Sequence, residues 1–265
     1  RTAASEIVDA GPIALERHGD VLVVGLNRQA KRNAINDETI EGLDEVFSAI
    51  PDDVRAVVIH GVGANFSAGL DLSEISERDV TEGVFHSRNW HRCFEKIEFG
   101  RVPVVAVLKG AVIGGGLELA CAAHVRVAEA NAFYALPEGQ RGIFVGGGGS
   151  VRLPKLIGVA RMADMMLTGR TYSATEGMPL GFSQYLVGDG EGFDRGLDIA
   201  TAMCRNAPLT NFAVIQALPR IADSDPRVGY LMESLVSAVA QGDKEAKSRV
   251  RAFLEKRAAK VTRPD

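Results

Sequence analysis

The sequence predicts an α/β fold, and two patterns carry that prediction. In the first half of the chain, short apolar runs at 21–26, 56–59, 103–108 and 125–128 alternate with segments of helical spacing. From residue 159 to 259 the apolar residues recur mainly with the 3.6-residue period of amphipathic helices. No low-complexity linker separates the two halves, although the C-terminal helices could form a small lobe.

The expected helices of the first half have recognisable starts or apolar faces. Asn36 is a suitable N-cap, with two acidic residues in the turn after it, and its helix should end before Pro51. Segment 89–97 places its large apolar residues on one side and predicts a second helix. An almost wholly apolar helix follows at 117–123 and contains a single carboxylate, Glu118. A further helix is expected at 150–157, and a loop at 65–71.

Composition excludes several classes of function. The 265 residues carry a formal net charge of −4, and no basic stripe predicts a nucleic-acid partner. No apolar run is long enough to span a membrane, and residues 1–10 lack the apolar core of a signal peptide. Cys93, Cys121 and Cys204 are odd in number and form no C-x-x-C pair. We therefore expect reduced thiols, a cytoplasmic location and no metal site, since the five histidines are also scattered.

Three glycine-containing turns are the candidates for chemistry, at 66–71, 114–116 and 136–139, with four more glycines at 146–149. A glycine turn between a strand and a helix lets a ligand approach the backbone and leaves N–H groups free at the helix start. Two such turns could direct two N–H groups at one carbonyl oxygen, forming an oxyanion hole. The glycines at 146–149 do not match the phosphate-binding P-loop pattern, and the chain has no G-x-S-x-G motif.

Two glutamates are the candidate acid and base. Burial among apolar neighbours and a second nearby carboxylate would both raise the pKa of Glu118, which suits proton transfer near neutral pH. Glu138 follows a proline in a turn and could face Glu118 across a cavity. Structural roles are also open: Glu118 could form an ion pair with Arg126 or Arg141, and Glu138 could be an exposed turn residue. Gly114–Gly116 could be merely a tight connection.

In this order, the motifs resemble the enoyl-CoA hydratase/isomerase (crotonase) superfamily. The matching pieces are Phe-Ser-Ala-Gly-Leu-Asp at 66–71, Gly-Gly-Gly-Leu-Glu-Leu-Ala at 114–120 and Leu-Pro-Glu at 136–138, followed by the glycine-rich loop. Flanking matches lie at 26–36, 167–176 and 253–257. The resemblance implies a spiral of ββα units over residues 1–200 and a helical trimerisation region over 201–265. It also implies a homotrimer or homohexamer.

The resemblance further implies an acyl-CoA thioester substrate and no cofactor, since coenzyme A is part of the substrate. Glu118 and Glu138 match the two glutamates of hydratases, and Ala68 and Gly115 match the N–H donors of the oxyanion hole. The other residues implied to bind substrate are Lys31, Ala34, Leu70, Asp71 and Gly146. The expected reaction is addition of water across the C2=C3 bond of a 2-enoyl-CoA, with methylthioacryloyl-CoA as one candidate substrate.

Other readings stay open at this point. An enoyl-CoA isomerase or an aromatic hydroxyacyl-CoA hydratase-lyase would use the same fold, and a remote alternative is an RNA-binding relative without activity. Two positions depart from the family pattern: His124 stands where Asp is usual, and Val145 where Pro is usual. We expect His124 to change a contact at a helix end and Val145 to reshape the acyl pocket.

Overall fold

The computed structural model describes residues 8–74, 78–255 and 257–258. Residues 1–7, within the segment searched for a signal peptide, lie outside the described residues, as does Lys256 of the 253–257 motif. The elements in chain order are β1 Val8–Ala10, β2 Ile13–His18, β3 Val21–Leu26, η1 Gln29–Lys31, α1 Asp37–Ser48, β4 Ala56–Gly61, η2 Leu72–Glu74, α2 Val80–Glu98, β5 Val104–Leu108, β6 Ala111–Ile113, α3 Gly115–Ala122, β7 Val125–Glu129, β8 Phe133–Ala135, η3 Gly139–Arg141, α4 Gly149–Ile157, α5 Val159–Thr168, β9 Tyr172–Ser173, α6 Ala174–Leu180, β10 Tyr185–Val187, α7 Gly192–Cys204, α8 Pro208–Gln216, α9 Leu218–Ala222, α10 Pro226–Gly242 and α11 Lys244–Leu254.

The larger sheet has the strand order β1-β2-β3-β4-β5-β7-β10. Strands β1, β2 and β3 pair antiparallel, whereas every pairing from β3 to β10 is parallel. In register, Val23 lies opposite Val58, and Val58 lies opposite Val105. Both faces of these central strands are buried, which explains why their sequences are continuous apolar runs.

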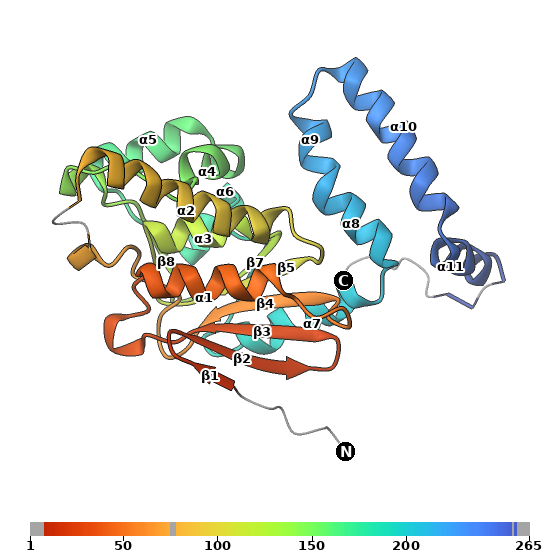
Figure 1. The fold of residues 1–265 in the computed structure, drawn as a ribbon, viewed down its shortest axis with the longest axis horizontal. Coiled ribbons are helices and arrows are strands. Elements are labelled where there is room, and N and C mark those ends of the chain that lie inside the picture. The colour runs from red at the N-terminus through yellow and green to blue at the C-terminus, as the bar shows by residue number, and fades with distance from the viewer. Residues whose placement is uncertain (1–7, 75–77, 256, 259–265) are drawn as a thin grey trace.

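Alternate residues of the parallel strands serve two separate cores. Val23, Val58 and Val107 belong to one set, which packs against α7 on one face of the sheet. The intervening residues, such as Val24 and Ile59, face the larger core that α1, α2 and α3 help to form. Figure 1 shows this layering, with α7 beneath the sheet and α1 and α2 above it.

The small sheet, with the order β6-β8-β9, brings the glycine turns together. Strands β6 and β8 are parallel, so their carboxyl ends lie side by side. Strand β6 leads into the turn before α3, and β8 leads to Glu138. The hydrogen bond from Gly114 N–H to the Ala135 carbonyl, 2.9 Å long, joins the two turns. A bridge between Ser67 and Val112 adds the 66–71 turn to the same edge.

Helices α8 to α11 project from this body as an arm (Figure 1). Many of their large apolar side chains are exposed in the single chain, among them Tyr230, Leu235 and Phe253, at 71%, 60% and 61% exposure. The predicted division at residue 200 falls inside α7, which packs on the sheet, and the arm begins at Pro208. The division into a catalytic core and a helical region remains a prediction.

The α/β prediction is confirmed, and four expected strands appear as β3, β4, β5 and β7. Asn36 caps α1 as predicted, because its Oδ1 accepts the Thr39 N–H at 3.1 Å. Helix α2 starts at Val80 rather than at residue 89. The prediction missed the first turns because their apolar residues remain exposed and do not continue the buried face of the helix. A capping box between Asp79 and Glu82 starts the helix. The short strands β1, β2, β6, β8, β9 and β10 were also missed.

Candidate active site

The glycine turn before α3 allows two segments to approach each other closely. Gly114 has φ +51°, and a Cβ built there would lie 2.5 Å from Oε1 of Glu138. A Cβ on Gly115 would lie 2.7 Å from the Trp90 ring, and one on Gly116 would lie 2.6 Å from the Ser67 Cβ. Any side chain at these positions would therefore push apart the parts of the site.

The side chain of Ser67 helps to hold the 66–71 turn together with backbone hydrogen bonds to neighbouring segments. The Ser67 hydroxyl donates to the Asn33 carbonyl at 2.7 Å and accepts the Gly69 N–H at 3.1 Å. Gly69 has φ +89°, and a Cβ there would lie 2.6 Å from the Ile113 carbonyl oxygen. The turn thus packs its backbone directly against the end of β6.

The structure corrects the predicted oxyanion donor of this turn. The Ala68 N–H is satisfied within the fold, because it donates to the Arg32 carbonyl at 2.9 Å. Leu70 N–H and Gly115 N–H have no hydrogen-bond acceptor among the described residues, and both residues line the cavity. A Cβ on Gly115 would lie 3.4 Å from the Leu70 nitrogen, so the two donors are neighbours. The pair that could bind one oxyanion is therefore Leu70 and Gly115.

Glu118 lies in the first turn of α3 and is 4% exposed. Its Oε1 accepts two backbone hydrogen bonds, from Gly147 N–H and Gly149 N–H, each 2.8 Å long. Burial raises the pKa of Glu118, and the backbone N–H groups of the glycine loop lessen that rise. The predicted ion pair with Arg126 is not formed, because the buried Arg126 donates instead to the carbonyls of Phe182 and Ala123. Among the described residues, Arg141 forms no ion pair with Glu118 either.

Glu138 starts the turn η3 and is 7% exposed, so the alternative of an exposed turn residue is also wrong. Its Oε2 is buried and has no hydrogen-bond partner among the described residues. Burial raises the pKa of Glu138 to about 7, and the nearby charge of Glu118 adds to the rise. The two N–H groups on Oε1 of Glu118 stabilise its carboxylate form, whereas the unpartnered oxygen of Glu138 has no such donor.

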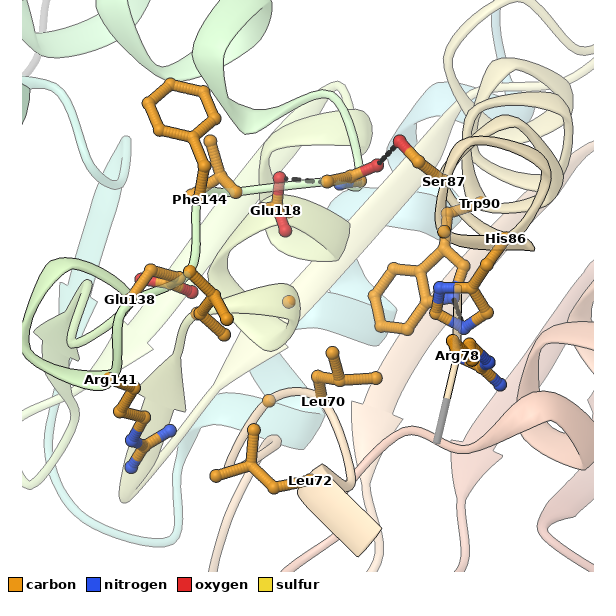
Figure 2. Close-up of a pocket in the computed structure, with 18 of the residues that line it drawn as sticks. Leu70, Leu72, Arg78, His86, Ser87, Trp90, Glu118, Glu138, Arg141 and Phe144 are labelled. Carbon is orange, nitrogen blue, oxygen red and sulfur yellow. Dashed lines mark hydrogen bonds between the residues drawn. The ribbon is translucent and has the colours of Figure 1, made fainter. Parts of the chain in front are cut away.

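Both glutamates line one cavity of about 520 Å³. Figure 2 shows Glu138 on the left of it, Trp90 and His86 on the right, Glu118 above and Leu70 below. Much of the wall is apolar, and it includes Val84, Ile143, Phe144, Val145 and Leu72. This combination of an apolar wall with a few converging polar groups is typical of a small-molecule site.

The predicted substrate-binding residues divide into two groups. Ala68, Leu70, Gly115 and Gly146 line the cavity. The others, Lys31, Ala34 and Asp71, are not among its lining residues.

Asp71 has a role within the fold. Its Oδ1 accepts a hydrogen bond from the Ser73 hydroxyl at 2.8 Å, and its Oδ2 is 2.9 Å from Arg28 Nη2. These two contacts lower the pKa of Asp71. The carboxylate therefore ties the end of the 66–71 turn to the segment after β3, and its predicted contact with substrate remains a prediction.

Sequence reasoning missed several residues of the site. Trp90 was interpreted as part of an apolar helix face, but its ring also packs against Gly115 and Gly147 and closes one side of the cavity. His86 lies one turn earlier and accepts the Trp90 indole N–H at 3.3 Å. Both lie on α2, whose first turns were not predicted. A search for helical periodicity that allowed apolar residues outside the main apolar face could have extended this helix toward its N-terminus and included His86.

The two departures from the family pattern have structural explanations. His124 lies just after α3, where its Nδ1 accepts the Val104 N–H and its Nε2 contacts the Glu98 carbonyl, both at 2.9 Å. Burial lowers the pKa of His124, which suits a neutral ring. Val145 is buried in the cavity wall. The His124 contacts confirm the predicted contact at a helix end. The predicted effect of Val145 on an acyl pocket stays a prediction.

Within the described ranges, no three His, Cys, Asp or Glu side chains are grouped so that they could hold a metal ion. None of the helices that the structure describes is long and apolar enough to cross a membrane. Cys93, Cys121 and Cys204 are buried free thiols, as the cysteine pattern predicted.

Comparison with known proteins agrees with this geometry. The model of the enoyl-CoA hydratase/isomerase family matches residues 16–263. A short-chain-enoyl-CoA hydratase of Clostridium acetobutylicum is 32% identical over 248 residues, which cover 92% of this chain and 95% of the relative. A carnitinyl-CoA dehydratase of Salmonella enteritidis is 35% identical over 219 residues, covering 82% of this chain and 83% of that protein.

A crystal structure from Rhodopseudomonas palustris CGA009, provisionally named an enoyl-CoA hydratase, superimposes with a TM-score of 0.91. It is 64% identical in sequence, and the match covers 96% of this chain and 98% of that one. These similarities confirm the crotonase-like fold expected from the motifs.

Proposed function

This chain belongs to the enoyl-CoA hydratase/isomerase family, and from that premise we propose that it adds water across the C2=C3 bond of a 2-enoyl-CoA thioester. The observation that carries the proposal is the meeting of two buried glutamates and two free backbone N–H groups at one cavity. A hydratase needs a base for water, a proton for C2 and a site for the developing negative charge. Glu118, Glu138, Leu70 and Gly115 can supply these.

In the proposed reaction, the thioester oxygen accepts hydrogen bonds from Leu70 N–H and Gly115 N–H. Glu118 removes a proton from water while the water oxygen bonds to C3. The electrons of the C2=C3 bond move toward the thioester, and the N–H pair stabilises the enolate oxygen. Glu138 then donates its proton to C2, giving a 3-hydroxyacyl-CoA. Transfer of the proton from Glu118 back to Glu138 restores the starting pair.

The assignment of base and acid follows from the hydrogen bonds. Oε1 of Glu118 accepts two N–H groups, which stabilise its carboxylate form. Glu138 has a buried oxygen without a partner and a pKa of about 7, which favours its protonated form. Because the two carboxyls are coupled, a titration would report on the pair as well as on each residue.

The apolar wall favours an apolar acyl group. Ile143, Phe144 and Val145 follow Glu138 in the chain and line the same cavity, and Val84 lines it from α2. We place the nucleotide end of coenzyme A outside this cavity, where Lys31 is exposed and can meet its phosphates. The reaction balances with water alone, so we propose no cofactor.

We also propose a homotrimer or a dimer of trimers. The supporting observation is the arm of α8–α11, whose exposed apolar side chains would be covered by other subunits. Sedimentation equilibrium of the purified chain tests this, and a monomer at all concentrations would contradict it. A cytoplasmic location is proposed because all three cysteines are buried free thiols.

The function is tested by following loss of the conjugated thioester absorbance with a panel of 2-enoyl-CoAs that includes crotonyl-CoA and methylthioacryloyl-CoA. The native protein should hydrate at least one member, and Glu138→Ala should lower kcat by between about 100- and 10,000-fold. Near-native turnover by Glu138→Ala would reject the two-glutamate mechanism. Isomerisation of a 3-enoyl-CoA that survives this substitution would instead favour an isomerase, and release of an aldehyde would favour a lyase.

A further inference from the structure

The glycine loop that binds Glu118 is itself held from two sides. On one side, the Ser87 hydroxyl of α2 donates to the Gly146 carbonyl at 2.6 Å (Figure 2). On the other side, Nη1 of Arg152 donates to the Gly147 carbonyl at 3.2 Å. Gly147 thus accepts a hydrogen bond from Arg152 while its own N–H donates to Glu118.

Arg152 can reach the loop because of its position in α4. Side chains of a helix tilt toward its N-terminus, and Arg152 lies in the first turns of α4, just after the loop. Gly148 has φ +93°, and a Cβ there would collide with Nη1 of Arg152. The loop therefore passes directly over the guanidinium group, and the glycine makes this contact sterically possible.

The buried charge of Arg152 is balanced by Glu98. Arg152 is 9% exposed, and its Nε lies 2.6 Å from Oε2 of Glu98 at the end of α2. The backbone carbonyl of Glu98 contacts His124 Nε2 at 2.9 Å. His124, which stands where the family usually has an aspartate, thus holds the backbone of Glu98. The side chain of the same Glu98 supplies the carboxylate beside Arg152.

We infer that Arg152 is a positioning residue, which fixes the glycine loop so that two N–H groups converge on Glu118 and which keeps this carboxylate ionised as the base. The inference rests on the proposed function for its catalytic meaning. It also rests independently on the chain of contacts from Glu98 through Arg152 and Gly147 to Glu118. The charge of Arg152 opposes the rise in the pKa of Glu118 that burial causes.

Other titratable groups lie around Glu118 and Arg152 on α2, on α3 and in the turn after β8. From α2, Glu98 contacts Arg152 directly, and His91 lies near the loop with a pKa that burial lowers. From α3, burial raises the pKa of the Cys121 thiol to about 11, so it is neutral at physiological pH. Glu138 faces Glu118 from the turn after β8. Arg152 is the cation that acts on Glu118 among these groups.

The test compares Arg152→Met, Arg152→Lys and Glu98→Gln with the native enzyme, using Lys155→Met as the control on an exposed part of α4. Arg152→Met should lower kcat about 100-fold, because loss of the loop contact displaces the base. It should also move the acid limb of the kcat/KM profile to higher pH, since Glu118 ionises less readily without the cation. Arg152→Lys should restore the acid limb and only part of kcat. Lys155→Met should match the native enzyme.

Glu98→Gln keeps the Arg152 charge but weakens its anchor, so kcat should fall without an upward shift of the acid limb. This variant keeps the inference testable if Arg152→Met does not fold. A purely structural Arg152 would lower the melting temperature and leave the acid limb in place, which would overturn the inference.

A ¹³C-carboxyl NMR titration, with the Glu118 signal assigned through Glu118→Gln, measures ionisation without any substrate. An unchanged Glu118 titration in both Arg152→Met and Arg152→Lys would reject the inference even if the enzyme hydrates enoyl-CoAs. A shift in Arg152→Met alone would support it even if the proposed substrate class proved wrong.

Discussion

Glu118 and Glu138 are the same residue type and line the same cavity, but the hydrogen bonds that their carboxyl groups accept are different. Glu118 accepts two backbone N–H groups from the loop before α4, whereas a buried oxygen of Glu138 has no partner among the described residues. Burial raises the pKa of both. The proposed assignment of base and acid therefore depends on main-chain donors rather than on side-chain identity.

The largest effect is expected when the ionisable group is removed from the glutamate that accepts the two backbone N–H groups, Glu118. Glu118→Gln keeps the shape of the side chain but cannot accept a proton from water. We expect kcat to fall by between about 100- and 10,000-fold with little change in folding. Turnover measurements on the best 2-enoyl-CoA, with circular dichroism as the folding control, would check this. A loss of less than tenfold would mean that Glu118 is not the base.

A second contrast concerns glycines in the loop itself. A Cβ on Gly149 would lie 2.7 Å from the Glu118 Cγ, whereas one on Gly146 would meet nothing closer than the Ser87 hydroxyl at 3.6 Å. Gly149→Ala should therefore displace Glu118 and lower kcat about 100-fold. Gly146→Ala is the matched control and should stay within a few-fold of native. Equal losses of kcat in the two variants would contradict the proposal that contacts with the glycine loop position Glu118.

A third contrast is thermodynamic and concerns Glu138. Its pKa of about 7 in the folded state lies above the ordinary value of 4.5, so the folded state binds the proton more tightly. The stabilisation is complete below about pH 4.5 and is lost as the pH rises through 7. Glu138→Gln remains neutral, so its unfolding free energy relative to native should increase from pH 5 to pH 8, by up to about 3 kcal/mol. Urea unfolding at the two pH values measures this, and a difference independent of pH would contradict it.

The sequence predicted the fold class and identified two glutamates that both line the cavity, because these depend on local patterns. Continuous apolar runs are typical of parallel strands buried on both faces, and β3, β4, β5 and β7 have such runs. A lone carboxylate in an apolar helix is costly unless it has partners, which marked Glu118 as unusual. Gly115 was also identified correctly as a residue of the cavity, because a glycine turn at a helix start leaves N–H groups free.

The prediction chose the Ala68 N–H rather than the free Leu70 N–H because the sequence does not show where each N–H of a turn points. Within the 66–71 turn, Ala68 and Leu70 are two residues apart, and a long-range contact with Arg32 decides which N–H is free. The Arg152–Glu98 pair is similarly invisible to local pattern, because 54 positions separate the two residues along the chain. Such choices depend on tertiary packing rather than on propensity.

The division of labour between backbone and side chains has a consequence for how such an enzyme can change. In the proposed reaction, the groups that stabilise negative charge at Leu70, Gly115, Gly147 and Gly149 are peptide N–H groups, which only a substitution by proline deletes. The acyl wall, by contrast, consists of side chains such as Phe144. If the proposed reaction is the one this chain catalyses, mutational drift at the wall can yield new substrate preferences in a lineage, while the chemical step is inherited with the turns.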